Sequence, residues 1–287
     1  MLSSARNTLY RCITLATIGA ASLPAFAQDQ ILIIGSREDA RRVAGSGSVI
    51  GQEQVHIEAA TDINQLLKTV PGIYIREEDG AGLRPNIGIR GATSERSSKI
   101  TLLEDGVMMA PAPYADPSAY YFPTAARQSA VEVLKGAPLL RYGPQTTGGV
   151  LNLVSTAIPK QTSAAMQIST DERGSNDLHG WVGSKQDGFS WLLETVQRDG
   201  AGFKDIDRAG DEAGFEIEDY VAKLGWESQG DGPKQRVFVK AQYSEELSNE
   251  TYLGLTDEDF KRDQNRRYGL TAIDEMDNRH DAMQASY

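Results

Sequence analysis

The chain has 287 residues and a formal net charge of -11, with 29 Lys and Arg against 40 Asp and Glu. This acidic balance argues against a nucleic-acid surface, because phosphate binding needs clustered cations. The single cysteine, Cys12, excludes an internal disulfide and a cysteine-based metal cage, and the three histidines are too scattered to suggest a metal site. We therefore expect no bound metal and no cofactor.

Residues 1–27 have the pattern of a cleaved signal peptide. Arg6 and Arg11 precede an apolar run over residues 12–23, and the small-residue pattern AFA ends at Ala27. The alternative is a short membrane anchor, but the run is shorter than the roughly 20 residues that span a bilayer. We expect cleavage after Ala27 and a mature chain outside the cytoplasm.

Residues 28–48 combine a short apolar segment with a polar linker. The letters ILII occupy residues 31–34, and residues 35–48 are rich in Arg, Gly and Ser. An extended segment on a linker can add as a strand to the sheet of a partner, through backbone hydrogen bonds. The alternative is that residues 31–34 form the first strand of the folded domain.

Residues 49–160 predict a compact domain of mixed α and β structure. After a capping residue, Thr61 or Asp62, apolar residues recur at helical spacing up to Val70, and Pro71-Gly72 ends the helix. The predicted strands before residue 131 are 72–76, 86–91 and 99–107, the last of which includes a hairpin turn at Glu104-Asp105-Gly106.

Residues 131–155, VEVLKGAPLLRYGPQTTGGVLNLVS, are the most informative stretch. Val131 and Val133 alternate with polar residues, as Leu151 and Leu153 do, which is typical of half-buried strands. The loop between them is dense in Gly and Pro and carries several hydrogen-bond donors. A domain that fills a pore and presents a loop to a ligand needs such a unit.

After residue 160, alternating segments of about ten residues recur between polar loops, which is the weak sequence signal of a membrane β-barrel. The predicted strands are 163–170, 178–185, 190–198, 216–227 and 235–245, with a partial strand at the end. One face of the last full strand carries Val237, Val239, Ala241 and Tyr243. We expect the charged connections 199–214 and 247–277 to be extracellular. Four aromatic residues are expected either at membrane interfaces or in ordinary packing, namely Trp181, Trp191, Trp226 and Tyr243.

Together these motifs resemble the TonB-dependent outer-membrane receptors. The strings DINQLLKTVPGIYI and NIGIRG and the stretch 131–155 look like the plug domain of that family, and residues 31–34 look like its TonB box. Three longer strings resemble the ferric dicitrate branch, at residues 95–117, 141–159 and 250–268. The resemblance implies an α+β plug domain followed by antiparallel β structure, as part of a barrel of about 22 strands. Residues 161–287 hold only the first of these strands, so we expect an incomplete barrel with an open sheet.

The resemblance also implies a function and a set of partners. The expected protein is no enzyme but a monomeric receptor of the Gram-negative outer membrane, which takes up an iron chelate, foremost ferric citrate, when TonB pulls on the box. The iron arrives only as part of this cargo, and the partners are TonB, the chelate and outer-membrane lipid. The TonB contacts are expected at Asp29, Ile31, Leu32, Ile33 and Ile34.

Ferric citrate is anionic and carries carboxylate and hydroxyl oxygens. Arginine guanidinium groups and amide or hydroxyl donors are suited to bind such oxygens. The ligand candidates in the plug are Gln145, Thr146, Arg141 and Thr101. The resemblance places Gln145 at a ligand-contacting position, and also Thr101, or Ser98 if one gap is placed differently. For Arg141 the alternative is an ion pair with the barrel wall.

Two other functions stay open from the sequence. The first is a receptor of the same family for another siderophore, cobalamin, a nickel complex or a sugar. The second is a soluble periplasmic ligand-binding or adhesive β-protein, in which residues 28–160 bind the ligand alone.

Overall fold

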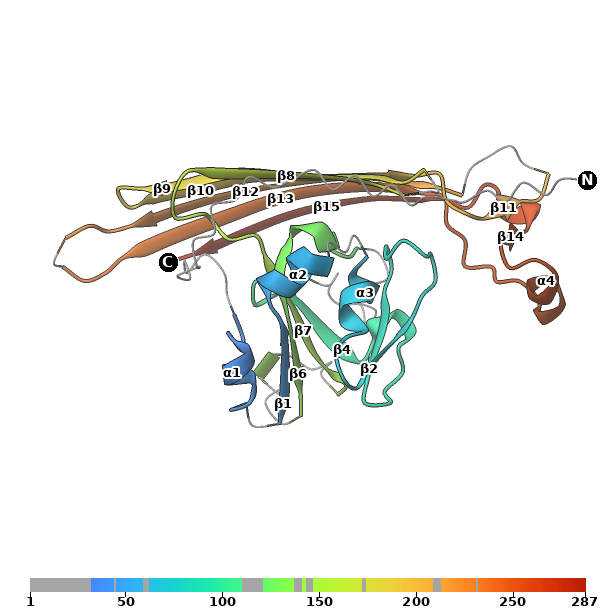
Figure 1. The fold of residues 1–287 in the computed structure, drawn as a ribbon, viewed down its shortest axis with the longest axis horizontal. Helices are drawn as coiled ribbons and strands as arrows, with labels where there is room; N and C mark the ends of the chain where they lie inside the picture. The colour runs from blue at the N-terminus through green and yellow to red at the C-terminus, as the bar shows by residue number, and fades with distance from the viewer. Residues whose placement is uncertain are drawn as a thin grey trace, which may run out of the picture.

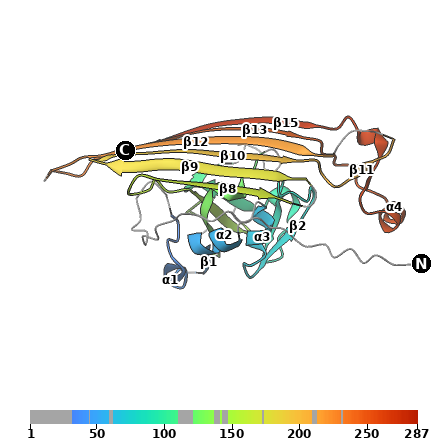
Figure 2. The ribbon, with the colours of Figure 1, turned by 45° about the horizontal axis from the view of Figure 1, so that its top comes forward.

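The computed structural model describes residues 32–43, 45–58, 62–109, 121–136, 141–142, 147–171, 174–208, 213–230 and 232–287. The predicted signal peptide lies outside the described residues. So do Asp29 and Ile31 of the predicted box, and the ligand candidates Gln145 and Thr146. The described chain has two parts, a compact mixed domain and a long curved sheet that lies across one side of it (Figures 1 and 2).

The mixed domain is built on a five-stranded sheet with the strand order β1-β6-β7-β4-β5. Its strands are β1 (Ser46–Ile50), β4 (Ile100–Glu104), β5 (Val107–Met108), β6 (Gln128–Lys135) and β7 (Gly149–Ser155). All neighbouring strands are antiparallel except β4 and β7. A separate hairpin joins β2 (Ile73–Arg76) to β3 (Asn86–Ile89). The helices are α1 (Arg37–Ala40), α2 (Gln52–Glu58) and α3 (Ile63–Leu67). This is the predicted α+β arrangement.

Helix α3 forms where the sequence predicts it and anchors the core of this domain. Of the two candidate caps, Asp62 is seen to accept a hydrogen bond from the backbone N–H of Asn64 at 2.7 Å. Leu66 and Leu67 are fully buried in the cluster that also contains Leu151 of β7. The helix ends before Gly72, which has a φ of +80° and so allows the chain to turn into β2.

The stretch 131–155 forms the predicted pair of strands, because β6 and β7 are antiparallel neighbours. The expectation that these strands are half-buried is wrong, since every residue of β7 is buried. One face of the sheet packs on the helices, and Ile33 and Ile34 cover part of the other. Alternation in the sequence did not reveal this second cover, because it comes from a distant segment.

The prediction of a linker over residues 35–48 also differs from the structure. Ser36 caps α1 by accepting from the backbone N–H of Asp39, and β1 pairs with β6 from Ser46 to Ile50. The predicted domain boundary at residue 49 therefore falls inside a strand. The strand SGSVI has little apolar alternation, and it is fixed by backbone hydrogen bonds to the edge of β6 instead.

The second part is a six-stranded antiparallel sheet whose strand order, β15-β13-β12-β10-β9-β8, follows the chain. Its strands are β8 (Ser163–Thr170), β9 (Asn176–Gln186), β10 (Phe189–Gly200), β12 (Phe215–Glu227), β13 (Arg236–Ser248) and β15 (Met276–Ser286). All five predicted strands are confirmed, with small shifts at their ends. The sheet is open, with β8 and β15 at its edges (Figure 1). Among the described residues, no helix is both long and apolar enough to cross a membrane.

The connections differ sharply between the two ends of this sheet. One end has the connections 187–188 and 228–235, and the other has 171–175, 201–214 and 249–275, of which the last two are the longest in the sheet. The last two are joined by β11 (Asp205–Ile206) and β14 (Arg266–Arg267), which pair in parallel, and the last also carries α4 (Asp257–Arg262). We call this end, at the right of Figure 1, the long-connection end.

Arg266 braces the two longest connections against each other. Its guanidinium contacts Asp207 of one connection at 2.8 Å and Asp259 of the other at 2.7 Å. Burial is partial for all three side chains, so the contribution of each pair to stability is small. Together with the β11–β14 pair, these contacts hold the two connections as one unit.

The two faces of the six-stranded sheet have opposite character. The inner face, which covers the mixed domain, holds buried polar side chains that include Glu194, Asp219, Lys223, Lys240, Gln242 and Glu246. The outer face exposes apolar side chains that include Met166, Ile168, Val182, Trp191, Leu193, Leu224 and Val237. The predicted alternation of β13 is confirmed. Of the two alternatives for the four aromatic residues, Trp181 follows ordinary packing, because it packs inward against Ile158, Leu192 and Phe238.

Candidate functional site

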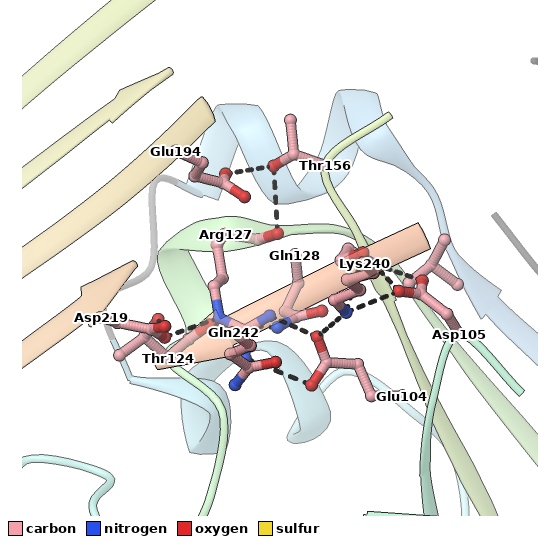
Figure 3. A network of polar contacts seen from close by, with 12 residues as sticks. Glu104, Asp105, Thr124, Arg127, Gln128, Thr156, Glu194, Asp219, Lys240 and Gln242 are labelled. Carbon is pink, nitrogen blue, oxygen red and sulfur yellow. Dashed lines mark hydrogen bonds and ion pairs between the residues drawn. The ribbon is translucent and has the colours of Figure 1, made fainter. Parts of the chain in front are cut away.

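A buried ionic network joins the mixed domain to the inner face of the sheet (Figure 3). Its centre is Arg127, a fully buried residue in the 3₁₀ turn Ala125–Arg127 that precedes β6. Arg127 donates from Nε to Asp219 of β12 at 2.7 Å, and both of its terminal nitrogens donate to Glu104 of β4. It also donates to the Tyr121 hydroxyl at 3.0 Å. One guanidinium thus links the two parts of the chain.

Two lysines extend the network from the sheet. Lys240 of β13 donates to Glu104 at 2.5 Å and to Asp105 at 2.7 Å. Lys223 of β12 donates to the Ser155 hydroxyl at 2.7 Å and to the backbone oxygen of Thr156 at 2.5 Å. The sheet therefore supplies cations that reach into the mixed domain.

The charges in this network compensate one another. Burial alone would raise the pKa of Glu104, but the nearby charges of Arg127 and Lys240 outweigh it, so that its pKa lies well below its ordinary value. Burial likewise acts against the charged form of Asp105, and Lys223 and Lys240 lower its pKa nonetheless. Carboxylates held ionised between cations are suited to fixing two surfaces together rather than to transferring protons.

Sequence reasoning recognised only part of this network. Glu104-Asp105-Gly106 was predicted to be a hairpin turn, which is confirmed by the β4–β5 pair and by the positive φ of Asp105 and Gly106. The ionic role of these carboxylates was missed, because Glu104 and its partner Lys240 are 136 residues apart. The available signal was the row of polar residues on the inward face of β13.

A second buried carboxylate holds the segment that precedes α1. Glu132 of β6 is fully buried and accepts the backbone N–H groups of Ile33, Ile34 and Gly35 at 2.7, 3.0 and 2.7 Å. It also accepts from Asn152 Nδ2 at 2.8 Å. Three consecutive backbone donors on one carboxylate fix this segment on the sheet.

Apolar packing supports the same contact. Ile33 and Ile34 pack against a small cluster of Leu103, Leu134 and Val150, on the face of the sheet opposite to α3. Of the residues predicted to contact a partner, these two therefore lie against the chain's own sheet. Leu32, at the start of the described chain, is half-buried.

The predicted ligand residues that the structure describes differ in exposure. Thr101 is 4% exposed within β4, whereas Ser98, the alternative at this position, is half-buried. Arg141 is exposed, and the described residues show no ion pair for it. With Gln145 and Thr146 outside the described residues, their contact with a ligand stays a prediction.

A pocket that sequence reasoning missed lies at the long-connection end, between the mixed domain and the sheet. It has a volume of about 90 Å³. One wall is the segment 78–84 between β2 and β3, and the others come from the connections 171–175, 201–214 and 249–275, the last of which includes Arg267. Because four separate segments form it, no single motif could have indicated it. We call it the seam pocket.

Comparison with known proteins gives these parts a family context. Residues 39–150 match the family described as TonB-dependent Receptor Plug Domain. The mixed domain is thus similar to a plug domain of TonB-dependent receptors over residues 39–150, and we call it the plug. The antiparallel sheet that follows, which we call the wall, has the fold of the corresponding strands in a solved receptor.

Two curated relatives are named vitamin B12 transporter BtuB. One, from Photobacterium profundum, is 24% identical over 62% of this chain and 29% of its own length. The other, from Vibrio vulnificus, is 25% identical over 60% of this chain and 27% of its own length. The chain therefore spans less than a third of the length of these relatives.

Two solved structures show the same fold. The ferric citrate transporter FecA in its unliganded form has a TM-score of 0.69 and 24% identity, over 81% of this chain and 36% of its own. The ferric yersiniabactin uptake receptor FyuA from Yersinia pestis has a TM-score of 0.60 and 20% identity, over 73% of this chain and 33% of its own.

Proposed function

We propose that this chain forms the plug and the first wall strands of a TonB-dependent receptor in the outer membrane, which imports an iron chelate, foremost ferric citrate. The observation that carries the proposal is the reversed polarity of the six-stranded sheet. Its charged face lies on the plug and its apolar face points outward, as expected of a barrel wall between a polar lumen and lipid. A soluble binding protein would bury the apolar face instead.

The orientation follows from the connections. Outer-membrane barrels have short turns on the periplasmic side and long loops outside. By this rule the long-connection end, with its braced loops and the seam pocket, faces the exterior and meets the chelate first. We propose Gln145, Thr146 and Arg141 as further chelate contacts, together with Thr101 or Ser98.

TonB is the proposed partner that drives import by pulling on the N-terminal box. Residues 29–34 form the proposed box, and Glu132 holds the end of this segment on the plug. A pull on the box would act on β6 through this carboxylate, and on the central strand β7 through Asn152, which donates to the same carboxylate.

The test uses the natural gene product in its own host. Under iron limitation, deletion of the gene should abolish growth on ferric citrate and leave growth on an unrelated iron source unchanged. The protein should be found in the outer-membrane fraction. Recovery from the soluble periplasm would contradict the membrane role, and unchanged growth on ferric citrate would contradict the cargo.

A corrinoid is the second candidate cargo, because both curated relatives described above are named vitamin B12 transporters. The two cargoes are separated by uptake of labelled cobalamin and labelled ferric citrate in the same deletion strain. Loss of cobalamin uptake alone would assign the corrinoid.

A further inference from the structure

Strand β1 has one edge that no other described strand occupies. It lies at the end of the five-stranded sheet and pairs on one side with β6. The backbone oxygen of Val49 accepts from Arg37 Nε at 3.2 Å, so this carbonyl points away from β6. Because backbone groups alternate between the two sides of a strand, those of Gly47 point the same way. The edge therefore presents backbone donors and acceptors with which a further strand can pair.

A groove with a volume of about 480 Å³ borders all five residues of β1. One wall is the segment 45–50, and the others come from α1 and Arg41, from Gln54 of α2 and from residues 69–71 after α3. Volumes of about 300–1,000 Å³ are typical of sites that hold ligands. Five residues of extended chain are about 17 Å long, so the groove has the length of a short extended segment. We call it the edge groove.

The edge groove is cationic, although the chain as a whole has a net charge of -11. The charged residues that line it are Arg37 and Arg41, and no acidic residue is among the lining. Arg37 donates to two neutral oxygens, those of Val49 and Gln54. No ion pair joins either arginine to a carboxylate of the described residues. Both arginines are exposed, so their charge is available to an anionic occupant.

Four carboxylates lie on the helices beside the groove without lining it, namely Glu38 and Asp39 of α1 and Glu53 and Glu58 of α2. Glu38 is paired with Arg42 at 3.0 Å. Asp39 and Glu58 each accept a hydrogen bond from a neutral side chain, at 2.6 and 2.8 Å. These carboxylates reduce the positive potential around the groove, but an occupant of the groove itself contacts arginines as its charged neighbours.

Arg37 covers part of the edge in this structure. Its side chain extends from α1 over the backbone oxygen of Val49 to the side chain of Gln54 on α2. A charged residue over a strand edge is a common protection against unwanted pairing. Because a carboxylate binds a guanidinium more strongly than a neutral oxygen does, an acidic segment can draw Arg37 away from the edge. A basic or neutral segment meets an edge that stays covered.

The position of the groove favours a partner on the side of the box. In both views of the fold, α1 and β1 lie on the side of the plug that is far from the long-connection end (Figures 1 and 2). In the proposed orientation this side faces the periplasm. Helix α1 follows directly on residues 33–35, which Glu132 holds on the sheet. A protein that reaches the box from the periplasm therefore meets the groove next.

We infer that the edge groove binds an extended acidic segment of the partner that pulls on the box. The segment pairs with Gly47 and Val49 as an additional strand, and its carboxylates bind Arg37 and Arg41. The inference rests on the proposed function, which supplies the partner. It gives the plug a second contact besides the box, because here the partner adds a strand to the sheet of the plug.

The first test uses peptides as probes of the full, detergent-solubilised gene product. The acetylated and amidated peptide EVEVE, at saturation, should slow hydrogen exchange at the backbone N–H groups of Gly47 and Val49 at least tenfold. Two comparison peptides should not. KVKVK is repelled by the arginines, and EVEVE with every backbone nitrogen methylated cannot pair with a strand edge. The inference is wrong if EVEVE gives no protection, or if either comparison peptide protects as well.

A matched pair of variants tests the charge of the groove. Arg41→Gln removes one of the two lining charges and should weaken the binding of EVEVE at least fivefold. Arg41 is exposed and has no ion pair within the described residues, so the variant should fold. Arg42→Gln changes the next residue, which is also exposed but does not line the groove, and should leave the affinity within twofold. Equal weakening by the two variants would contradict binding in the groove.

The partner is tested with the periplasmic domain of the host's TonB. It should slow exchange at Gly47 and Val49 in the unaltered protein, and do so less in Arg41→Gln. No protection of these two N–H groups would overturn the assignment of the groove to this partner. The proposed function fails separately. If TonB and EVEVE both protect β1 but the gene is dispensable for growth on ferric citrate, the groove stands and the cargo is wrong.

Discussion

The two faces of the six-stranded sheet carry opposite kinds of side chain, although the same strands form both. On the inner face, Lys240 and Asp219 are buried against the plug and each meets an opposite charge from it. On the outer face, Leu193 and Leu224 are more than half exposed. Since side chains of a strand alternate between its faces, each strand carries both patterns at once. The difference teaches that this sheet places charge inside and apolar surface outside, the reverse of a soluble protein.

The largest expected effect comes from breaking the inner face. Arg127→Ala leaves Glu104 and Asp219 buried without their shared cation, which should destabilise the contact between plug and wall by about 3–5 kcal/mol. Urea unfolding followed by tryptophan fluorescence measures the loss. Arg262→Ala is the matched control, because Arg262 is 67% exposed and pairs with Glu258, so it should cost about 0–1 kcal/mol. Equal losses for the two variants would contradict the structural role of the network.

The next effect comes from the outer face. Leu193→Arg places a charge on the exposed side of β10, which should cost about 2–4 kcal/mol if that side meets the middle of a bilayer. Leu247→Arg, on the same face at the long-connection end of β13, should cost about 0–1 kcal/mol. Folding into lipid vesicles measures both values. If the two variants behave alike, this face does not lie across a bilayer as proposed.

The five-stranded sheet of the plug differs from the wall, because both of its faces are covered at β6. Glu132→Gln retains the shape of the side chain but removes the charge that binds the N–H groups of residues 33–35, which should loosen this segment by about 1.5–3 kcal/mol. Hydrogen exchange at Ile33 and Ile34 should accelerate. Glu53→Gln, at an exposed site of α2, should leave this exchange unchanged.

The smallest expected effect is a pH dependence at the long-connection end. The pKa of Glu250 is about 7 in the folded protein and near 4.5 in the unfolded chain, so the folded state holds more protons between these values. The free energy of unfolding should therefore fall as the pH rises from about 4.5 to 7, by about 1–2 kcal/mol after allowance for partial exposure. Glu250→Gln should flatten this part of the profile. A slope that persists in the variant would point to other groups.

The sequence predicted the elements whose formation depends on residues close together in the chain. The five wall strands, the hairpin turn at Asp105-Gly106 and the helix after Asp62 follow from alternation, turn residues and capping, which depend only on neighbours. Strand β1 was missed, because its position depends on the free edge of β6 rather than on its own side chains.

The candidate sites were harder to predict from the sequence, because their residues come from distant segments. Arg127 was not singled out, since its partners Glu104 and Asp219 come from distant segments, and the seam pocket combines four of them. The role of Glu132 was hidden, because its partners are backbone N–H groups, which leave no trace in residue types. The proposed contacts of Gln145 and Thr146 rest on resemblance and await measurement.

The strand orders of the two sheets have a consequence for how the chain acquires its structure. Each wall strand pairs with a strand next to it in sequence, so the wall can zip together hairpin by hairpin. In the plug, Ser46 of β1 pairs with Lys135 of β6, and β7 must then settle between β6 and β4. Such distant contacts close slowly, since a long loop must be ordered before they form. The plug is therefore expected to be the slow step of folding, against a wall that is quicker to assemble.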